Sequence, residues 1–311
     1  MRPGRAGFSL VELIVAITAS ALLGAGVIGV LVRQQKFFRA ATEMLGVRAQ
    51  VRDGIDILVS DIRSAAVASF GIPLMTDSAI ELYSVTGTSV ICRTPVGAVV
   101  YLPPSLLASG NTLTSFVAQP DDGDLAMLYA TDSANGDGRW DVFRIAAFTG
   151  QSVSSACPPA EGFTSPGDLS ASGSAFQLTL GETPSGDVRK GSPVRFVRRA
   201  RYSLYRSGDG KWYLGYRRCD PGGVGGCDAV QPVSGPYMPY AGGAGAPSGI
   251  GFRYYDAQGL ELSGGSSGNS VARIDITVRS ESTGALRLAG DAVTRYRDSS
   301  VVSVSPRNRL R

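Results

Sequence analysis

The sequence contains no histidine among its 311 residues. This absence removes the commonest general base, the serine and cysteine triads that depend on it, and the usual zinc ligand. The scattered Asp and Glu residues form no paired motif that could take over acid–base chemistry. We therefore expect a protein that is not an enzyme and that holds no metal or other cofactor.

Dense basic clusters are also lacking. The net charge is +4, and the basic residues are scattered or concentrated near the two ends, without interleaved aromatic side chains. A nucleic-acid surface requires a basic patch on one face. We therefore expect no direct contact with nucleic acid.

Cysteine is scarce, with four residues and no Cys-x-x-Cys pair. An even number in an exported chain favours disulfides over metal or redox chemistry. Three pairings are possible; the short spacing favours Cys219 with Cys227, which leaves Cys92 with Cys157. Free buried cysteines remain the alternative.

The most prominent feature present is the 25-residue apolar run from Phe8 to Val32, long enough for a helix to cross a bilayer. Arg2 and Arg5 precede it, so the positive-inside rule places the amino terminus in the cytoplasm. The run is longer than the core of a secretory signal, and no cysteine follows it as in a lipoprotein anchor. We predict a single-pass membrane helix over residues 8–32, with the rest extracytoplasmic.

One acid, Glu12, interrupts this run. A charged side chain deep in a bilayer costs a few kcal/mol and usually has a partner or a function. A cut between Gly7 and Phe8 would create an α-amino group close to Glu12. In a bundle of such helices, the amine of one subunit could meet the carboxylate of the next.

The stretch "GFSLVE", behind a short basic leader, resembles the class III signal of type IV pilins and type II secretion pseudopilins. The resemblance implies that a prepilin peptidase removes residues 1–7 after Gly7 and methylates Phe8. It also implies that Glu12 aligns an incoming subunit in a filament. The alternative is a plain signal-anchor helix with a stray glutamate.

After Val32 the chain turns polar, with Arg33, Lys36 and Arg39 at the outer interface and no clear helix breaker before Gly71. Apolar residues recur every three or four positions, which predicts that the outer half of the helix, residues 33–70, packs on the head. Asp61 and Arg63 are interpreted as part of a solvated face. The stripe comprises Phe37, Ala41, Met44, Val51, Ile55, Leu58, Ile62 and Ala65.

Residues 71–311 read as short β-branched and aromatic runs separated by Gly, Ser, Pro and Asp, which predicts an antiparallel β-rich head and an α+β fold. The turn "SGDG" predicts a hairpin between two alternating runs. The expected strands are 80–85, 89–94, 97–102, 124–131, 140–148, 175–180, 194–206, 211–219, 250–256, 272–280 and a last segment near 299–308.

The end of the long helix and the closing hairpins are similar to those of J-type minor pseudopilins and large minor pilins. The region around 95–175 is longer than a minimal member of that group requires. We expect an inserted subdomain there, held by Cys92 and Cys157.

The segment Asp132–Asp141 loosely resembles a calcium loop, since it offers Asn135, Asp137 and Asp141 around a glycine turn. Ser133 stands where the first aspartate should be, and no glutamate closes the loop. We favour a plain Asx/Gly turn over a cation site.

Taken together, these features favour a minor pilin or pseudopilin that assembles near the tip of a type IV pilus or a type II secretion pseudopilus. The resemblance implies as partners the peptidase/methyltransferase, other pilins, an inner-membrane platform with its ATPase, and the lipid bilayer. An adhesin or substrate receptor on the same stalk is the alternative, and a membrane-tethered hydrolase is disfavoured. The choice between a secretion system and a pilus or DNA-uptake machine stays open.

Overall fold

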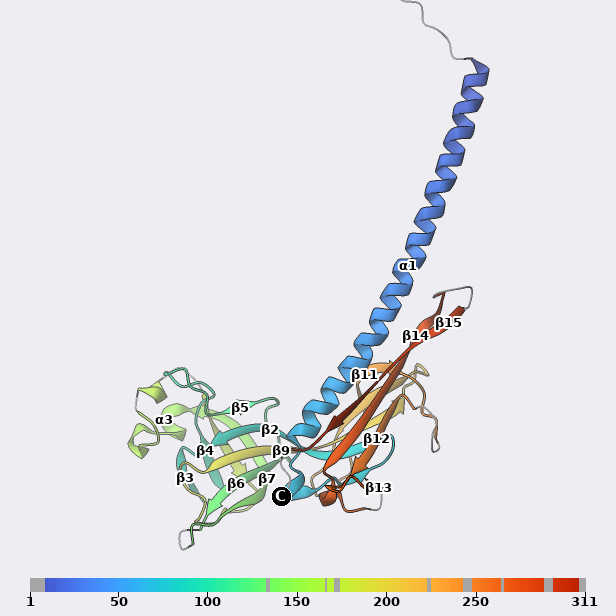
Figure 1. The fold of residues 1–311 in the computed structure, drawn as a ribbon. Coiled ribbons are helices and arrows are strands. Elements are labelled where there is room, and N and C mark those ends of the chain that lie inside the picture. The colour runs from blue at the N-terminus through green and yellow to red at the C-terminus, as the bar shows by residue number, and fades with distance from the viewer. Residues whose placement is uncertain are drawn as a thin grey trace, which may run out of the picture.

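The computed structural model of the chain describes residues 9–132, 135–165, 167–170, 174–222, 225–242, 248–263, 266–287 and 293–307. A long helix, α1 (Leu10–Ser64), projects from a head built of antiparallel strands (Figure 1). The predicted α+β class is confirmed.

The outer half of α1 packs on the head, whereas its first half extends away from it (Figure 1). The predicted stripe is buried at Val51, Leu58 and Ile62. Phe37, at the start of the stripe, is 69% exposed. The packing begins later than predicted because only the end of the hairpin formed by β14 (Arg273–Arg287) and β15 (Val293–Val304) reaches the level of Phe37. The fully buried positions of α1 are Val47, Val51, Gly54, Leu58 and Ile62.

Hydrogen bonds between α1 and the head orient the helix on the sheet. The hydroxyl of Tyr237 donates to the carbonyl oxygen of Gln50 at 3.0 Å, and Ser280 Oγ donates to Gln50 Oε1 at 2.7 Å. Arg48, which lies between Met44 and Val51 of the stripe, is exposed and donates from Nε to Tyr296 Oη at 3.2 Å. Because these bonds have one favourable geometry each, they fix the rotation of α1 about its axis.

Gly54 lies in close contact with Tyr237 of the head. A Cβ atom at this position would lie 3.1 Å from Tyr237 Cζ, and closer still to its hydroxyl oxygen. Tyr237 cannot retreat without losing its hydrogen bonds to Gln50 and to Ser234 Oγ, the latter at 2.6 Å. Glycine therefore permits the contact, although it weakens a helix by about 1 kcal/mol relative to alanine.

We expect Gly54→Ala to lower the free energy of unfolding by about 1–3 kcal/mol through overpacking. Gly46→Ala is the matched control on the same helix, because no described atom lies within 4 Å of its Cβ. That substitution should raise the free energy of unfolding by about 1 kcal/mol. Denaturant unfolding of the detergent-solubilised protein, followed by circular dichroism, measures both. Equal stabilisation by the two alanines would contradict the close packing of Tyr237.

The helix ends earlier than predicted. It stops at Ser64 instead of continuing to Gly71, and a separate short helix, α2 (Val67–Phe70), follows. Ala65 has extended backbone angles and forms a bridge with Ser84, and the Ala66 N–H donates to the Tyr83 carbonyl at 2.8 Å. The chain leaves the helix because a neighbouring strand satisfies its backbone groups, which helix propensity alone does not anticipate.

The strands form an 11-stranded sheet with the main order β1-β2-β9-β6-β7-β8-β4-β3, and a four-stranded sheet with the order β13-β12-β14-β15. In the larger sheet, β10 pairs with β9 and β11, and β5 pairs with β2. The remaining bounds are β1 (Leu74–Met75), β2 (Ala79–Val90), β3 (Arg93–Val96), β4 (Val99–Leu102), β5 (Ser115–Phe116), β6 (Leu125–Thr131), β7 (Gly138–Ser152), β8 (Ser174–Leu180), β9 (Pro193–Arg206), β10 (Trp212–Arg218), β11 (Gln231–Tyr237), β12 (Ile250–Tyr255) and β13 (Glu261–Leu262). Four short helical turns, α3 (Val153–Ala156), η1 (Pro159–Glu161), η2 (Asp168–Ser170) and η3 (Gly268–Ser270), lie in connections.

Every predicted strand overlaps an observed one, and the "SGDG" hairpin is confirmed between β9 and β10. The predicted strand 80–85 lies within β2, and the predicted strand 89–94 spans the end of β2 and the start of β3; a register shift between Val85 and Gly87 interrupts the pairing of β2 with β9. Sequence reasoning missed β11, whose two prolines and glycine mask its strand character. It forms nevertheless because it pairs with the edge of β10.

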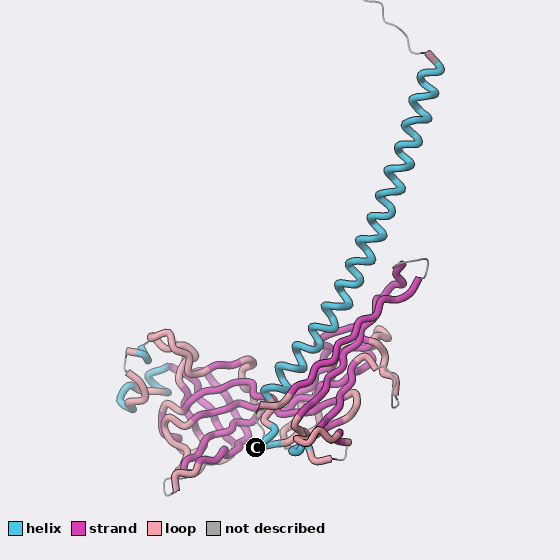
Figure 2. The backbone as a smooth tube through the Cα atoms, in the orientation of Figure 1, coloured by secondary structure: helices cyan, strands magenta, loops and turns pink. Residues whose placement is uncertain are grey.

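The head has two lobes, one on each side of the point where α1 ends (Figure 2). The first lobe contains the docked half of α1 and the four-stranded sheet, and the second is built by the strands from β3 to β8. Strands β2 and β9 run through both, paired from Ala79 with Ser203 to Val90 with Pro193. This continuous ladder is the backbone connection between the lobes.

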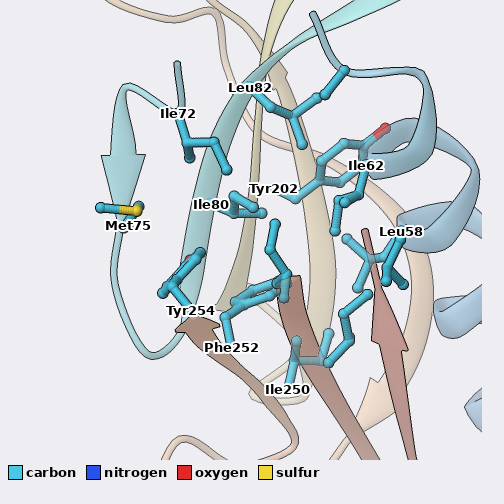
Figure 3. Packing of buried hydrophobic residues seen from close by; sticks show 14 of the residues in the cluster. Leu58, Ile62, Ile72, Met75, Ile80, Leu82, Tyr202, Ile250, Phe252 and Tyr254 are labelled. Atoms are coloured by element: carbon cyan, nitrogen blue, oxygen red, sulfur yellow. The ribbon is translucent and has the colours of Figure 1, made fainter. Parts of the chain in front are cut away.

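Each lobe has its own core. In the first, Leu58 and Ile62 of α1 meet Ile80, Phe252 and Tyr254 from the two sheets (Figure 3). In the second, a separate apolar cluster around Phe196 and Leu128 includes residues of β4, β6, β7, β8 and β9. Two cores on one long ladder mean that the second lobe does not depend on α1 for its packing.

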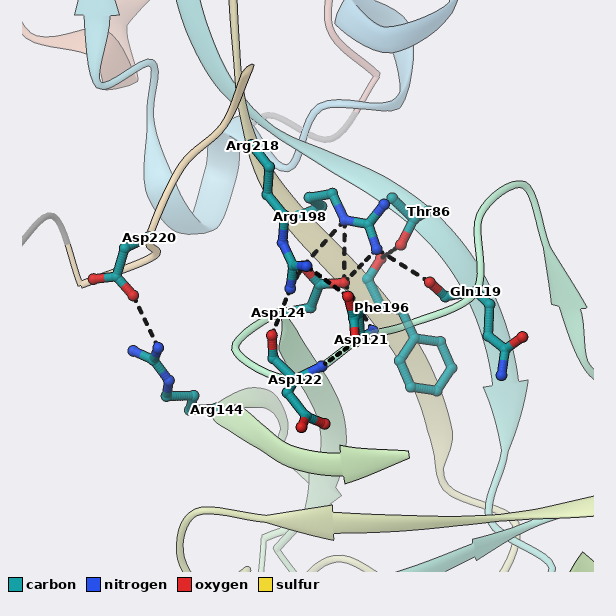
Figure 4. Close-up of polar contacts among 10 residues, drawn as sticks. All are labelled: Thr86, Gln119, Asp121, Asp122, Asp124, Arg144, Phe196, Arg198, Arg218 and Asp220. Carbon is teal, nitrogen blue, oxygen red and sulfur yellow. Dashed lines mark hydrogen bonds and ion pairs between the residues drawn. The ribbon is translucent and has the colours of Figure 1, made fainter. Parts of the chain in front are cut away.

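Paired charges lie where the lobes join. Asp124, at the start of β6, is 2% exposed and accepts from Arg198 at 2.7 Å and from Arg218 at 3.0 Å (Figure 4). Arg144 of β7 pairs with Asp220 across the same junction at 2.9 Å (Figure 4). Because Asp124 is bonded on both sides, its burial is compensated, and the contacts tie β6 to β9 and β10.

Candidate functional site

The first half of α1 exposes a continuous apolar surface. Leu10 and Leu22 are 74% and 77% exposed, and an 18-residue window of this helix has a mean hydropathy of 2.3. The segment from Leu10 to Val32 would be about 35 Å long at 1.5 Å per residue, enough for about 30 Å of hydrocarbon. Among the described helices, α1 is the one that meets the length and composition of a membrane span.

Glu12 has a partner within its own chain. Its Oε2 atom accepts from the Ser9 backbone N–H at 3.0 Å, while Ser9 Oγ accepts from the Val11 N–H at 3.2 Å. Together they form a capping box, which satisfies backbone donors at the start of α1. A single helix therefore supplies Glu12 with a hydrogen-bond partner of its own.

The signal for this cap was present in the sequence. Ser9 and Glu12 have the Ser-x-x-Glu spacing that begins many helices. The Ser9 N–H is one donor, and an ionised carboxylate can accept several hydrogen bonds, so Glu12 can still bind a further partner. The cap orients Glu12 at the end of the helix without neutralising its charge.

Gly7 and Phe8, the residues expected to flank the cleavage site, lie outside the described residues. The nearest described positions are Ser9 and Leu10, which begin α1. Cleavage at Gly7 and methylation at Phe8 stay predictions.

The four cysteines come together in the two pairs that their spacing favoured. Cys92 and Cys157 are bonded, with their Cα atoms 5.5 Å apart, and Cys219 is bonded to Cys227. The first bond lies in a small buried cluster with Leu107 and Leu169. It closes a chain separation of 65 residues and so ties the second lobe together at its outer end.

The segment Asp132–Asp141, compared above with a calcium loop, contains the turn between β6 and β7. In its described part, the Gly136 N–H donates to the Asp132 carbonyl at 2.9 Å, and Asp141 is in an ion pair with Arg139 at 2.9 Å. Among the described residues, Glu81 with Cys219 and Cys227 is the one group of three or more Cys, Asp or Glu side chains whose ligand atoms all lie within 4.8 Å of one another. These cysteines are bonded to each other, so their sulfurs are not thiolate ligands.

Asp61 is not part of a solvated face, as the sequence suggested, whereas Arg63 is exposed. The Tyr202 hydroxyl donates to Asp61 Oδ2, and Ser84 Oγ approaches the same oxygen at 3.5 Å. Burial raises the pKa of Asp61 above its ordinary value, while the two hydrogen bonds oppose the shift. The acid is a structural contact between α1 and the sheet, and the helical periodicity gave no signal for it.

The prokaryotic N-terminal methylation motif matches residues 2–28, the segment that contains the short basic leader, Glu12 and most of the apolar run. No curated protein and no solved structure matches the chain. The motif implies processing by prepilin peptidase and assembly with other pilins. Together with the long amino-terminal helix and the β-rich head, it supports placing this chain in the type IV pilin and pseudopilin superfamily.

Proposed function

We propose that the protein is a minor pilin or pseudopilin, a structural subunit of a periplasmic filament and not an enzyme. The observation that carries the proposal is the methylation motif at residues 2–28, at the start of a helix whose apolar half is not buried against any described part of the head. Before assembly, residues 8–32 hold the subunit in the inner membrane, with the amino terminus cytoplasmic and the head periplasmic. On assembly the whole mature chain, from Phe8 onward, enters the filament, with the apolar half of α1 inward and the head outward.

Processing comes first in this proposal. The prepilin peptidase removes residues 1–7, and the new amino group on Phe8 is methylated. Cleavage supplies the cation that Glu12 lacks in its own helix. An inner-membrane platform with its ATPase then extracts the apolar helix from the bilayer.

In the filament, Glu12 of one subunit pairs with the Phe8 amine of a neighbour. The apolar surface around Glu12 excludes water once helices pack together, so an unpaired carboxylate there would be costly. The pair therefore sets axial register more than it adds stability. The capping box supports this role because it fixes the carboxylate at the helix end.

The form of the head supports a minor position, close to the filament tip. The lobe built by β3–β8, which includes the expected insertion around 95–175, adds a second core beside the one on α1. A subunit packed on all sides by copies of itself favours a compact head. At the end of a filament a subunit has fewer neighbours, so a bulky lobe can be accommodated there without steric clashes.

Immunogold labelling tests this position. An antibody against the second lobe should label isolated filaments at one end only. Labelling along the whole length would contradict a minor role. Mature chain that stays entirely in the membrane, in cells that make filaments, would contradict assembly itself.

A binding function on the same stalk is the second candidate. The observation in its favour is the second lobe, which has its own core and exposes Val117, at 93%, and Leu106, at 59%. Such a lobe could present an adhesin surface or a receptor for secreted substrate. Pull-down with the chain lacking its first 35 or so residues separates the two roles, since a pure scaffold retains only other pilins.

A further inference from the structure

A groove lies between α1 and the free end of the β14–β15 hairpin, just beyond the apolar half of the helix. The hairpin end rises beside α1, away from the rest of the head (Figure 1). The groove has a volume of about 1110 Å³. Its apolar lining includes Phe37, Ala41, Met44 and Leu45 of α1 and Leu286 and Val293 of the hairpin, and we call it the membrane-proximal groove.

Four cations line the same groove: Arg33, Lys36, Arg39 and Arg48. None of the lining residues in the described part of the chain is acidic. Arg48 is in an ion pair with Asp298, at 3.9 Å, and is the one cation of the four with such a partner among the described residues. The groove therefore combines an apolar floor with excess positive charge.

Arg33 and Lys36 lie at the depth of lipid headgroups and Arg39 lies just beyond it, given the topology of the proposed function, on which this inference rests. At 1.5 Å per residue, Arg33 to Arg39 lie about 1.5–10 Å beyond Val32, and the headgroup region adds about 5–8 Å on each side of the hydrocarbon. Phe37 and Phe38 at this level are 69% and 65% exposed. Aromatic and basic side chains together are typical of interfacial anchors.

Arg33, Lys36 and Arg39 lie on the side of the membrane where basic residues are disfavoured. Three cations follow the apolar run within seven residues, on the side of the membrane where the positive-inside rule disfavours them. They do not serve to orient the helix, because they act against the orientation set by Arg2 and Arg5. A ligand with negative charge at the same level would explain them.

We propose that the membrane-proximal groove binds an anionic phospholipid of the bilayer that α1 spans. Lys36 and Arg39, with Arg33, contact the phosphate, while Phe37 and Val293 contact the apolar part next to the headgroup. The bound lipid holds the hairpin, and through it the head, at the membrane surface before assembly. Extraction of the helix then has to break this contact.

Native mass spectrometry of the full chain tests the proposal. The protein is reconstituted in nanodiscs that contain equal amounts of phosphatidylglycerol and phosphatidylcholine, and the lipids that remain bound after release are counted. The wild-type chain should retain phosphatidylglycerol preferentially. Each cation near a membrane surface contributes about 1 kcal/mol, so Lys36→Gln with Arg39→Gln should lower this preference about 25-fold.

Two control variants keep the test specific. Arg52→Gln removes an exposed cation from α1 outside the groove, and Arg253→Gln removes one from β12. Both should retain the wild-type preference. Equal retention of the two lipids by the wild type, or an equal loss in the controls, would overturn the proposal. An acidic protein segment bound there in place of lipid would also overturn it.

Lipid retention is measured on single chains, so it does not depend on cleavage or assembly. If the preference is absent from a chain that is cleaved and assembled normally, the lipid site is wrong and the proposed function stands. If the preference is present in a chain that is never cleaved, the proposed function fails and the lipid site stands.

Discussion

Replacing Glu12 with glutamine should abolish incorporation of the chain into filaments and leave its cleavage intact. Glutamine keeps an Oε atom that can accept from the Ser9 N–H, so the capping box is preserved while the charge is lost. Removing one partner of a buried charge pair costs about 3–5 kcal/mol, which is more than about 100-fold in an equilibrium constant. The loss therefore reports on pairing between subunits and not on the start of α1.

The measurement is the amount of mature chain in sheared filaments relative to the amount in the membrane. Asp56→Asn is the matched control, because Asp56 is an exposed acid on the extramembrane part of the same helix. It should incorporate like the wild type. Normal incorporation of the glutamine variant at position 12 would refute the pairing.

The second large effect concerns the fold of the head. Replacing Glu81 with alanine should lower the free energy of unfolding by about 3–5 kcal/mol, because it removes the buried counter-charge of two partly buried arginines. Glu81 of β2 is 1% exposed and accepts from Arg199 Nε at 2.5 Å and from Arg201 Nη2 at 2.7 Å. Both arginines belong to β9, so the cluster lies across the ladder that both lobes share.

Glu281 provides a matched control, since it also bridges two arginines on a neighbouring strand. It pairs with Arg295 at 2.8 Å and Arg297 at 3.2 Å, but these arginines are 56% and 66% exposed. Surface ion pairs contribute about 0–1 kcal/mol, so Glu281→Ala should have a small effect. Denaturant unfolding of both variants gives the comparison. Similar losses of unfolding free energy in the two variants would show that burial of Glu81 does not increase the contribution of its ion pairs to stability.

Much of the architecture could be predicted from local sequence patterns. The apolar run with a single acid, the helical stripe around Leu58 and the alternating strands each depend on short-range periodicity, which a sequence displays directly. The pairing of Cys219 with Cys227 is similarly local, since only eight positions separate them.

The features that sequence reasoning missed arise from tertiary contacts. The helix stops at Ser64 because a strand accepts the chain at Ala65, and Asp61 is half-buried because Tyr202 lies opposite it. The division into two lobes depends on the full length of the β2–β9 ladder, which joins residues more than 100 positions apart. The helix end, the environment of Asp61 and the two lobes are each determined by distant residues, so the local sequence does not predict them. The cap formed by Ser9 is different, because its spacing was visible.

The most direct test is mass spectrometry of the amino terminus of the native protein, purified from its own membrane or filament. The account predicts a chain that begins at Phe8 and carries an N-methyl group on that residue. A chain that still begins with the seven-residue leader would contradict it, because Glu12 would then have no neighbouring amine with which to pair.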